Sequence, residues 1–182
     1  CTAQPIQAGT PRTFSKDDCV VTMTSTGVTA DLANNVVTLP EMDGRPPSNS
    51  YSHAYIIITN TFGLRGSVTI KNGSGDDVKY CSEANGDSTA GTTAGSFCTA
   101  QNHTETLDDF GDGSFSAYFA PATMDGGGKV SALLTAADAN LTTATNTGEV
   151  ERLIGVFETN SVINDSTNGL EMQLTVTDIG YG

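Results

Sequence analysis

Short stretches of alternating apolar and polar residues run along the chain, separated by clusters of glycine, proline and asparagine. The strongest stretch covers residues 54–62, in which Ile56 and Ile58 would lie on one face of a strand and Ile57 on the other. Because both faces are apolar, we expect this strand to lie in the centre of its sheet. The pattern as a whole is typical of an all-β chain.

Several further segments have a strand-like pattern, and they are 19–24, 36–39, 68–70, 78–81, 114–120, 149–159 and 170–181. Residues 71–77, KNGSGDD, predict the turn of a hairpin between two of these strands, and 41–50 predicts a loop. The apolar spacing of 130–141 also fits one face of a helix, so a short helix is allowed there. Residues 149–159 fit both periods, and their context favours a strand.

The composition supports this pattern and suggests how the strands are arranged. The chain of 182 residues contains 27 Thr, 15 Ser, 20 Gly and 12 Asn, a mixture that favours strands joined by polar turns. About eight to ten short strands at this spacing predict an antiparallel β-sandwich of jelly-roll or immunoglobulin-like type. We expect an N-terminal arm over 1–18, which has two prolines and little alternation, and a single domain over 19–182.

The charge balance excludes two classes of partner. Twenty-one acidic against eight basic residues give a formal net charge of −13, which opposes binding to nucleic acid and to anionic membranes. No apolar run approaches the roughly 20 residues of a membrane span. The sequence begins at Cys1 and not at Met, so we expect a processed product whose targeting segment has been removed.

Four cysteines form an even set in a chain rich in Thr, Ser and Gly, which favours disulfides and an extracellular or cell-surface location. We prefer a Cys81–Cys98 bond because the glycine-rich residues between them look like a loop that a disulfide would restrain. Cys1 with Cys19 then follows by elimination. Alternatively, Cys1 is a lipidated N-terminal cysteine of the kind found in bacterial lipoproteins.

The sequence assigns no catalytic residue, and we expect a protein that is not an enzyme. It has two histidines and no G-x-S-x-G elbow around any serine. Glu41 and Asp43 resemble half of the carboxylate pairs of glycoside hydrolases. However, position 45 is arginine, and the chain has no tryptophan to form a sugar platform. A jelly-roll hydrolase is therefore the less favoured alternative.

A cluster of aspartates in LDDFGDGS offers a weak candidate for a cation site. Asp108, Asp109 and Asp112 could converge on Ca²⁺, because carboxylates on glycine-rich loops are suitable ligands for hard cations. Their spacing does not match a calcium-binding loop, so turn chemistry is the other interpretation. The sequence indicates no required cofactor, with Ca²⁺ as the only candidate.

Four N-x-S/T sequons make N-glycosylation a candidate modification. Their number is not higher than the composition predicts by chance. They lie at Asn72, Asn102, Asn140 and Asn164.

The C-terminus carries a family resemblance. Gly169 lies fourteenth from the end, Tyr181 is penultimate, and alternating apolar residues lie between them. This segment resembles the terminal strand of chaperone–usher pilins, in which a neighbouring subunit donates a strand to an incomplete immunoglobulin-like sandwich. The sequence departs from that pattern where Asp178 falls in the apolar register, and residues 1–18 lack the alternation of a donor strand.

The resemblance implies a structural subunit of an extracellular fibre, pilus or surface layer that assembles with copies of itself by β-strand addition. Residues 160–169 would be the tether and 170–176 the donor strand, within a possible exchanged strand over 170–182. The expected subunit interface consists of Leu170, Met172, Leu174, Val176 and Tyr181. The alternatives are an ordinary final strand, donation by the N-terminal arm, and a monomeric surface adhesin or carbohydrate-binding module with glycan partners.

Overall fold

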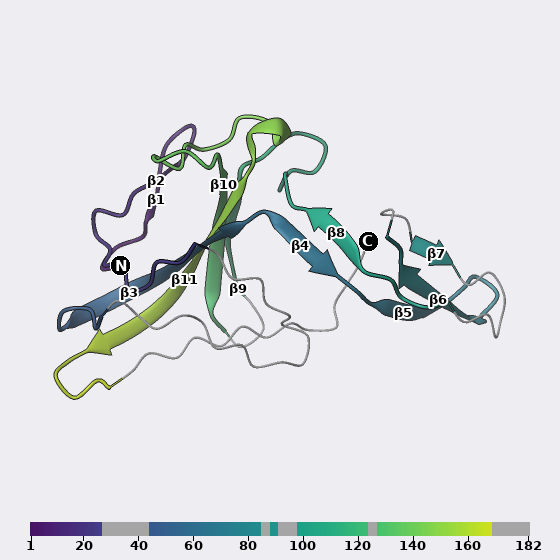
Figure 1. The fold of residues 1–182 in the computed structure, drawn as a ribbon, viewed down its shortest axis with the longest axis horizontal. Coiled ribbons are helices and arrows are strands. Elements are labelled where there is room, and N and C mark those ends of the chain that lie inside the picture. Colours follow the sequence, from purple (N-terminus) through teal and green to yellow (C-terminus); the bar gives the residue numbers. More distant parts are fainter. Residues whose placement is uncertain (27–43, 85–87, 91–97, 124–126, 169–182) are drawn as a thin grey trace. The chain divides into compact units, whose positions relative to one another are not determined.

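The computed structural model describes residues 1–26, 44–84, 88–90, 98–123 and 127–168 (Figure 1). Its regular elements are antiparallel β-strands and one short 3₁₀ helix, η1 (Thr147–Glu149), so the predicted all-β class is confirmed. The strands are β1 (Ile6–Gln7), β2 (Thr13–Phe14), β3 (Asn49–Thr59), β4 (Thr61–Leu64), β5 (Ser67–Lys71), β6 (Asp77–Ser82), β7 (Ser88–Ala90), β8 (His103–Thr106), β9 (Tyr118–Thr123), β10 (Lys129–Thr135) and β11 (Arg152–Ile163).

The chain forms two compact units. Unit 1 comprises Cys1–Thr59 together with the described residues from Asp108 onward, and unit 2 comprises Asn60–Leu107. Compactness does not show whether a unit folds independently. The division into an arm over 1–18 and a single domain over 19–182 therefore stays a prediction.

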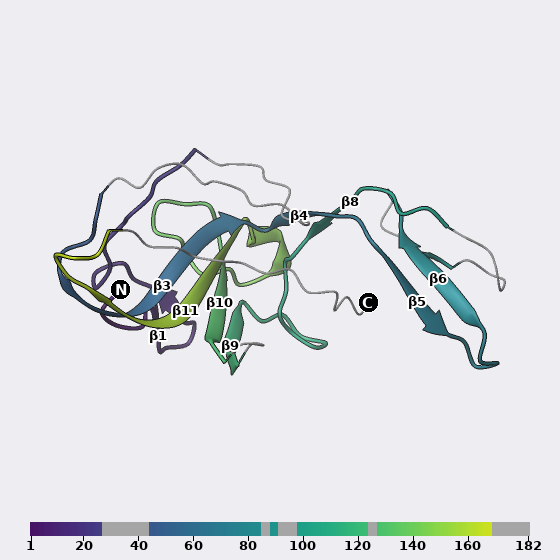
Figure 2. The same cartoon turned by 90° about the horizontal axis from the view of Figure 1, so that it is seen from below.

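Unit 1 is built on a four-stranded antiparallel sheet in the order β3-β11-β10-β9 (Figure 2). The registers of its three strand pairs place four large side chains in one row across the sheet. Leu133 of β10 lies opposite Tyr118 of β9 and Ile154 of β11, and Ile154 lies opposite Ile57 of β3. Cross-strand neighbours of this kind stabilise a sheet mainly through side-chain packing.

A small hairpin of β1 and β2 covers this row and completes the core. Ile6 of β1 is buried in one cluster with Leu133 and Ile154. Phe14 of β2 packs edge-on against Tyr55, with 5.2 Å between the ring centroids. Residues from the first eighteen therefore contribute directly to the core of unit 1.

A disulfide and backbone hydrogen bonds also tie the N-terminal residues to the sheet. Cys1 is bonded to Cys19, as the sequence predicted. Next to this bond, the His53 N–H donates to the Cys1 carbonyl at 3.1 Å, and the Cys1 nitrogen donates to the His53 carbonyl at 2.7 Å. These two bonds place Cys1 beside β3, opposite the side on which β11 pairs with His53.

Unit 2 contains a two-stranded sheet, β4-β8, and a three-stranded sheet, β5-β6-β7. The predicted hairpin is confirmed, since β5 pairs with β6 on either side of the predicted turn, from Lys71 opposite Asp77 to Ser67 opposite Cys81. The second predicted disulfide, Cys81–Cys98, is also present. Among the described residues of this unit, the buried hydrophobic ones are Val78 and Cys81, so the apolar core is small.

Two predicted strands differ from the structure. Residues 19–24 form no strand: Val20 and Val21 are 41% and 51% exposed, and no strand pairs with them among the described residues. The predicted strand 54–62 is divided between β3 and β4, and β3 lies at the edge of its described sheet and not at the centre. The side chains on its two apolar faces, Ile56, Ile57 and Ile58, are half-buried, and such burial does not depend on a lateral partner on both sides.

The structure also decides the remaining predicted segments. The helix allowed within 130–141 is wrong, because β10 runs to Thr135 and a turn follows in which the Asp138 carboxylate accepts the N–H groups of Asn140 and Thr142. The strand predicted over 114–120 begins only at Tyr118. The strand predicted over 149–159 is confirmed from Arg152 onward by β11, whereas Glu149 lies in η1. Residues 36–39 and 170–181 lie outside the described residues.

We expect Leu133→Ala to destabilise the protein by about 2–5 kcal/mol, because it removes a fully buried side chain from the central row. Thermal or urea unfolding followed by circular dichroism measures the change. Val162→Ala, at a position that is 65% exposed, is the control and should stay within about 0.5 kcal/mol of wild type. Equal losses in the two variants would contradict the assignment of the core.

We also expect the double substitution Cys81→Ser with Cys98→Ser to loosen unit 2 selectively. Closing a loop of this length contributes about 3 kcal/mol in the chain-entropy model, a large share of the stability of a unit with a small core. Hydrogen exchange read by mass spectrometry should show faster exchange in β5 and β6 and unchanged exchange in β10 and β11. Uniform acceleration across both units would contradict this expectation.

Candidate functional site

Strand β5 presents the most open sheet edge in the described part of the chain. All five of its residues are exposed, which is true of no other strand whose side chains are described. It pairs with β6 on one side and with no described strand on the other (Figure 1). An open edge leaves backbone N–H and C=O groups available to another strand.

One face of this edge is apolar. Val68 and Ile70 are each 47% exposed and are two residues apart, so their side chains lie on the same face of β5. The β5–β6 register sets them opposite Tyr80 and Val78, respectively. The four side chains form an apolar strip, which begins at the buried Val78 and ends at the free edge.

The other face of the edge is polar and carries positive charge. Thr69 lies opposite Lys79, and Lys71 lies opposite Asp77. The Lys71 Nζ is 3.0 Å from the Asp77 Oδ1, and both side chains are well exposed, so this ion pair stabilises the hairpin by less than about 1 kcal/mol. A strand added beside β5 would therefore meet an apolar face on one side and a lysine-bearing face on the other.

The turn that holds β5 against β6 is organised by Asn72. Its Oδ1 accepts the N–H groups of Ser74 and Asp76, both at 2.9 Å. Gly75 has a φ of +87°, a backbone conformation that favours glycine. The sequence KNGSGDD thus specifies its own turn, and this turn fixes the register of the exposed strand.

The two edges of the unit 1 sheet are less open than β5. Along β3, Cys1 already occupies the hydrogen-bonding positions of His53. Along β9, Pro121 has no N–H to donate, and the pairing with β10 shifts register between Val130 and Ala132. Proline and irregular pairing are common means by which proteins protect an edge strand from association.

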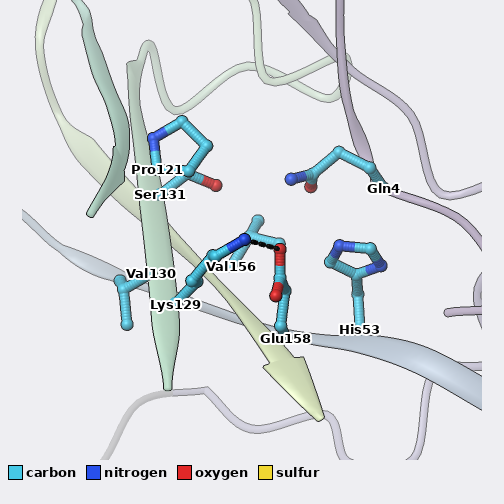
Figure 3. A pocket seen from close by; sticks show the side chains of 8 residues that line it. All are labelled: Gln4, His53, Pro121, Lys129, Val130, Ser131, Val156 and Glu158. Atoms are coloured by element: carbon cyan, nitrogen blue, oxygen red, sulfur yellow. Dashed lines mark ion pairs between the residues drawn. The ribbon is translucent and has the colours of Figure 1, made fainter. Parts of the chain in front are cut away.

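A shallow hollow in unit 1 collects several polar side chains (Figure 3). Along its floor, His53 of β3 lies opposite Glu158 of β11, and the Lys129 Nζ of β10 is 3.8 Å from the Glu158 Oε1. Burial lowers the pKa of His53, which leaves its imidazole mainly neutral at pH 7. The lysine and glutamate are both partly exposed, and this arrangement is an ordinary cross-strand ion pair.

The serine next to His53 has a structural role. Ser52 Oγ lies 2.8 Å from the His53 Nδ1 and donates to the Thr2 carbonyl at 3.0 Å. The Ser52 hydroxyl therefore helps to hold the N-terminal residues against β3 through this hydrogen bond. We assign the group Ser52, His53 and Thr2 to attachment of this segment and to no chemistry.

The aspartates predicted as a weak cation site form a turn. Asp109 Oδ1 accepts the N–H groups of Gly111 at 2.6 Å and Ser116 at 2.8 Å. Gly111 is required there, since a Cβ at this position would lie 1.7 Å from the Ser114 carbonyl oxygen. In the described part of the chain no three His, Cys, Asp or Glu side chains gather to hold a metal ion, so Asp108, Asp109 and Asp112 are not brought together.

Each sequon asparagine is exposed in the structure. Asn72 and Asn164 both lie in turns in which the side-chain carbonyl accepts a backbone N–H two residues later. Glycosylation at Asn72, Asn102, Asn140 and Asn164 stays a prediction. The predicted interface residues Leu170, Met172, Leu174, Val176 and Tyr181 lie outside the described residues, as do Glu41 and Asp43.

The open edge of β5 was not identified from the sequence. Its five residues, SVTIK, predict a strand in which hydrophobic and polar residues alternate, and such a pattern normally indicates one buried face.

No family model, no curated protein and no solved structure matches this chain. Among the described residues no helix has the length and apolarity to cross a membrane.

We expect Asp109→Asn to lower the melting temperature at pH 7. The N–H groups of Ser116 and Gly111 hold the pKa of the Asp109 carboxyl below its usual range. The resulting stabilisation is fully present above the unfolded pKa of about 3.9 and is lost as the pH falls through the lower folded value. The difference between the two proteins should therefore shrink below about pH 4.

Asp112→Asn is the control for this experiment, because it makes the same change of charge at an exposed position in the same loop. Differential scanning fluorimetry from pH 7 to pH 2.5 compares the three proteins. A difference between Asp109→Asn and wild type that does not depend on pH would contradict a role for the carboxylate charge.

Proposed function

We propose that this protein is a structural subunit of an extracellular fibre, pilus or surface layer, and that it assembles with copies of itself by β-strand addition. The observation that carries this proposal is the open edge of β5, on which Val68 and Ile70 are exposed and along which no described strand pairs. A monomeric protein normally protects such an edge. A protein that adds a strand from a neighbour leaves it open.

The covalent structure supports an extracellular location. Two disulfides link all four cysteines of the chain, and disulfides of this kind persist in oxidising compartments. One of them closes unit 2, whose core is small, and the other secures the N-terminal residues to unit 1. A subunit with these two disulfides would stay folded outside the cell, where intracellular chaperones cannot refold it.

The arrangement of unit 1 supports a sandwich of jelly-roll or immunoglobulin-like type as its fold. Its sheet is apolar on both faces: Leu133 and Leu134 are adjacent on β10, so their side chains lie on opposite faces, and both are fully buried. The β1–β2 hairpin covers the Leu133 face. A second layer over the Leu134 face would complete a sandwich.

The C-terminal segment is the better of the two candidate donors. The N-terminal residues are bound within their own unit by the Cys1–Cys19 bond and by the burial of Ile6. Donation by this arm would expose part of the core. In residues 170–176 the sequence alternates as a donor strand requires, with Leu170, Met172, Leu174 and Val176 on one face.

We expect the purified, non-reduced protein to form filaments that increase with concentration, and a variant truncated after Asn168 to stay monomeric. Electron microscopy and size-exclusion chromatography measure assembly, and circular dichroism shows whether the truncated variant keeps its fold. A synthetic peptide of residues 169–182 should also inhibit filament growth of the intact protein. Monomers at every concentration would contradict self-assembly and favour a monomeric adhesin.

A further inference from the structure

The open edge of unit 2 identifies the place at which a neighbouring subunit would bind. We propose that residues 170–176 of a second copy of this chain add to the free edge of β5 as an extra strand. This inference rests on the proposed function, to which it adds the acceptor strand. It also commits to one occupant, the C-terminal segment of another subunit.

The backbone of β5 is available for such pairing. Its five residues are all exposed, and the described part of the chain provides a strand on its β6 side only. The seven residues 170–176 are enough to match this edge along its whole length. Each new backbone hydrogen bond would then use a group on the side of β5 along which no described strand pairs.

The side chains of the two strands are complementary in period. Leu170, Met172 and Leu174 alternate with polar residues, as Val68 and Ile70 do. In one register the apolar side chains of the donor lie on the same face as Val68 and Ile70 and extend the strip that begins at Val78. A slip of one residue would place them on the lysine-bearing face, so burial selects the first register.

Charge selects the same register. The polar face of β5 and β6 carries Lys71 and Lys79 together with Asp77, which forms an ion pair with Lys71, so two positive charges and one negative charge leave a net charge of +1. The polar face of the donor segment carries Glu171, and its remaining polar side chains in 170–176, Gln173 and Thr175, are uncharged. Opposite charges on neighbouring strands are favourable, so the acidic residue and the two lysines lie on one face when the apolar residues share the other.

The edges in unit 1 do not offer an equivalent acceptor. His53 on β3 already exchanges hydrogen bonds with Cys1, and β9 contains Pro121. Val162 of β11 is 65% exposed, but β11 lies between β3 and β10 and has no free edge. In unit 2, β4 and β8 also have one unpaired side among the described strands, but β5 is the one of these three strands whose residues are all exposed.

The test blocks the acceptor without changing the donor. Val68→Lys combined with Ile70→Lys places two charges on the apolar side of the edge, at exposed positions where the fold tolerates them. The matched control is Val20→Lys with Val21→Lys, which adds the same charge at similarly exposed valines in unit 1. We expect filament mass to fall about tenfold or more in the first variant and to stay near wild type in the control.

A mixing experiment then tests the contact directly. The blocked variant retains a donor and lacks an acceptor, and the chain truncated after Asn168 retains an acceptor and lacks a donor. Each alone should be monomeric, and the two together should form a one-to-one complex that does not grow. Size-exclusion chromatography with light scattering detects this complex, and circular dichroism confirms that both variants are folded.

The outcomes separate the two proposals. Filaments that survive the lysine substitutions but vanish on truncation would overturn the acceptor assignment and leave the fibre function intact. A wild-type protein that stays monomeric would overturn the fibre function itself. Loss of filaments in both lysine variants would show an effect of added charge alone and would also overturn the assignment of β5.

Discussion

Four strands of unit 1 meet at one row of side chains, and the rest of the unit depends on their register. Leu133 and Ile154 occupy the middle of the row, with Tyr118 and Ile57 at its two ends. Because side chains alternate between the faces of a strand, a slip of one residue in any one of these strands would turn its member of the row away from the β1–β2 hairpin. The burial of Ile6 against Leu133 and Ile154 therefore specifies the register and attaches the hairpin at the same time.

Unit 2 is stabilised differently, and this difference explains its open edge. Few of its described residues are buried, and the Cys81–Cys98 bond provides a covalent link where a larger core would otherwise be needed. The Asn72 turn fixes the β5–β6 hairpin locally. A sheet held by a disulfide and a turn does not require Val68 and Ile70 to be buried within the unit. They are therefore available for a partner.

The contrast between protected and open edges links the fold to assembly. In unit 1 the N-terminal residues lie along part of β3, and Pro121 interrupts β9. Both features limit pairing with another chain. In unit 2 nothing comparable is described along β5. In the proposed assembly, β5 is the best-exposed of the unpaired edges in the described part of the chain, which favours strand addition at that surface.

Local and covalent features were predictable from the sequence, because nearby residues decide them. The composition and alternation predicted an all-β chain, and KNGSGDD predicted the β5–β6 turn. The glycine-rich loop between Cys81 and Cys98 indicated one disulfide, and the other followed by elimination. Aspartates in LDDFGDGS were consistent with turn chemistry, which Asp109 shows in the structure.

Only the tertiary structure decided which alternating segments are paired, buried or exposed. The alternation in 19–24 resembles that of β5, yet the first forms no strand and the second is an open edge. Likewise, the two apolar faces of β3 did not reveal that the strand lies at a sheet edge. The physical reason is that an alternating pattern records which side chains favour burial. Lateral hydrogen-bonding partners come from segments far away in the chain, and the pattern carries no information about them.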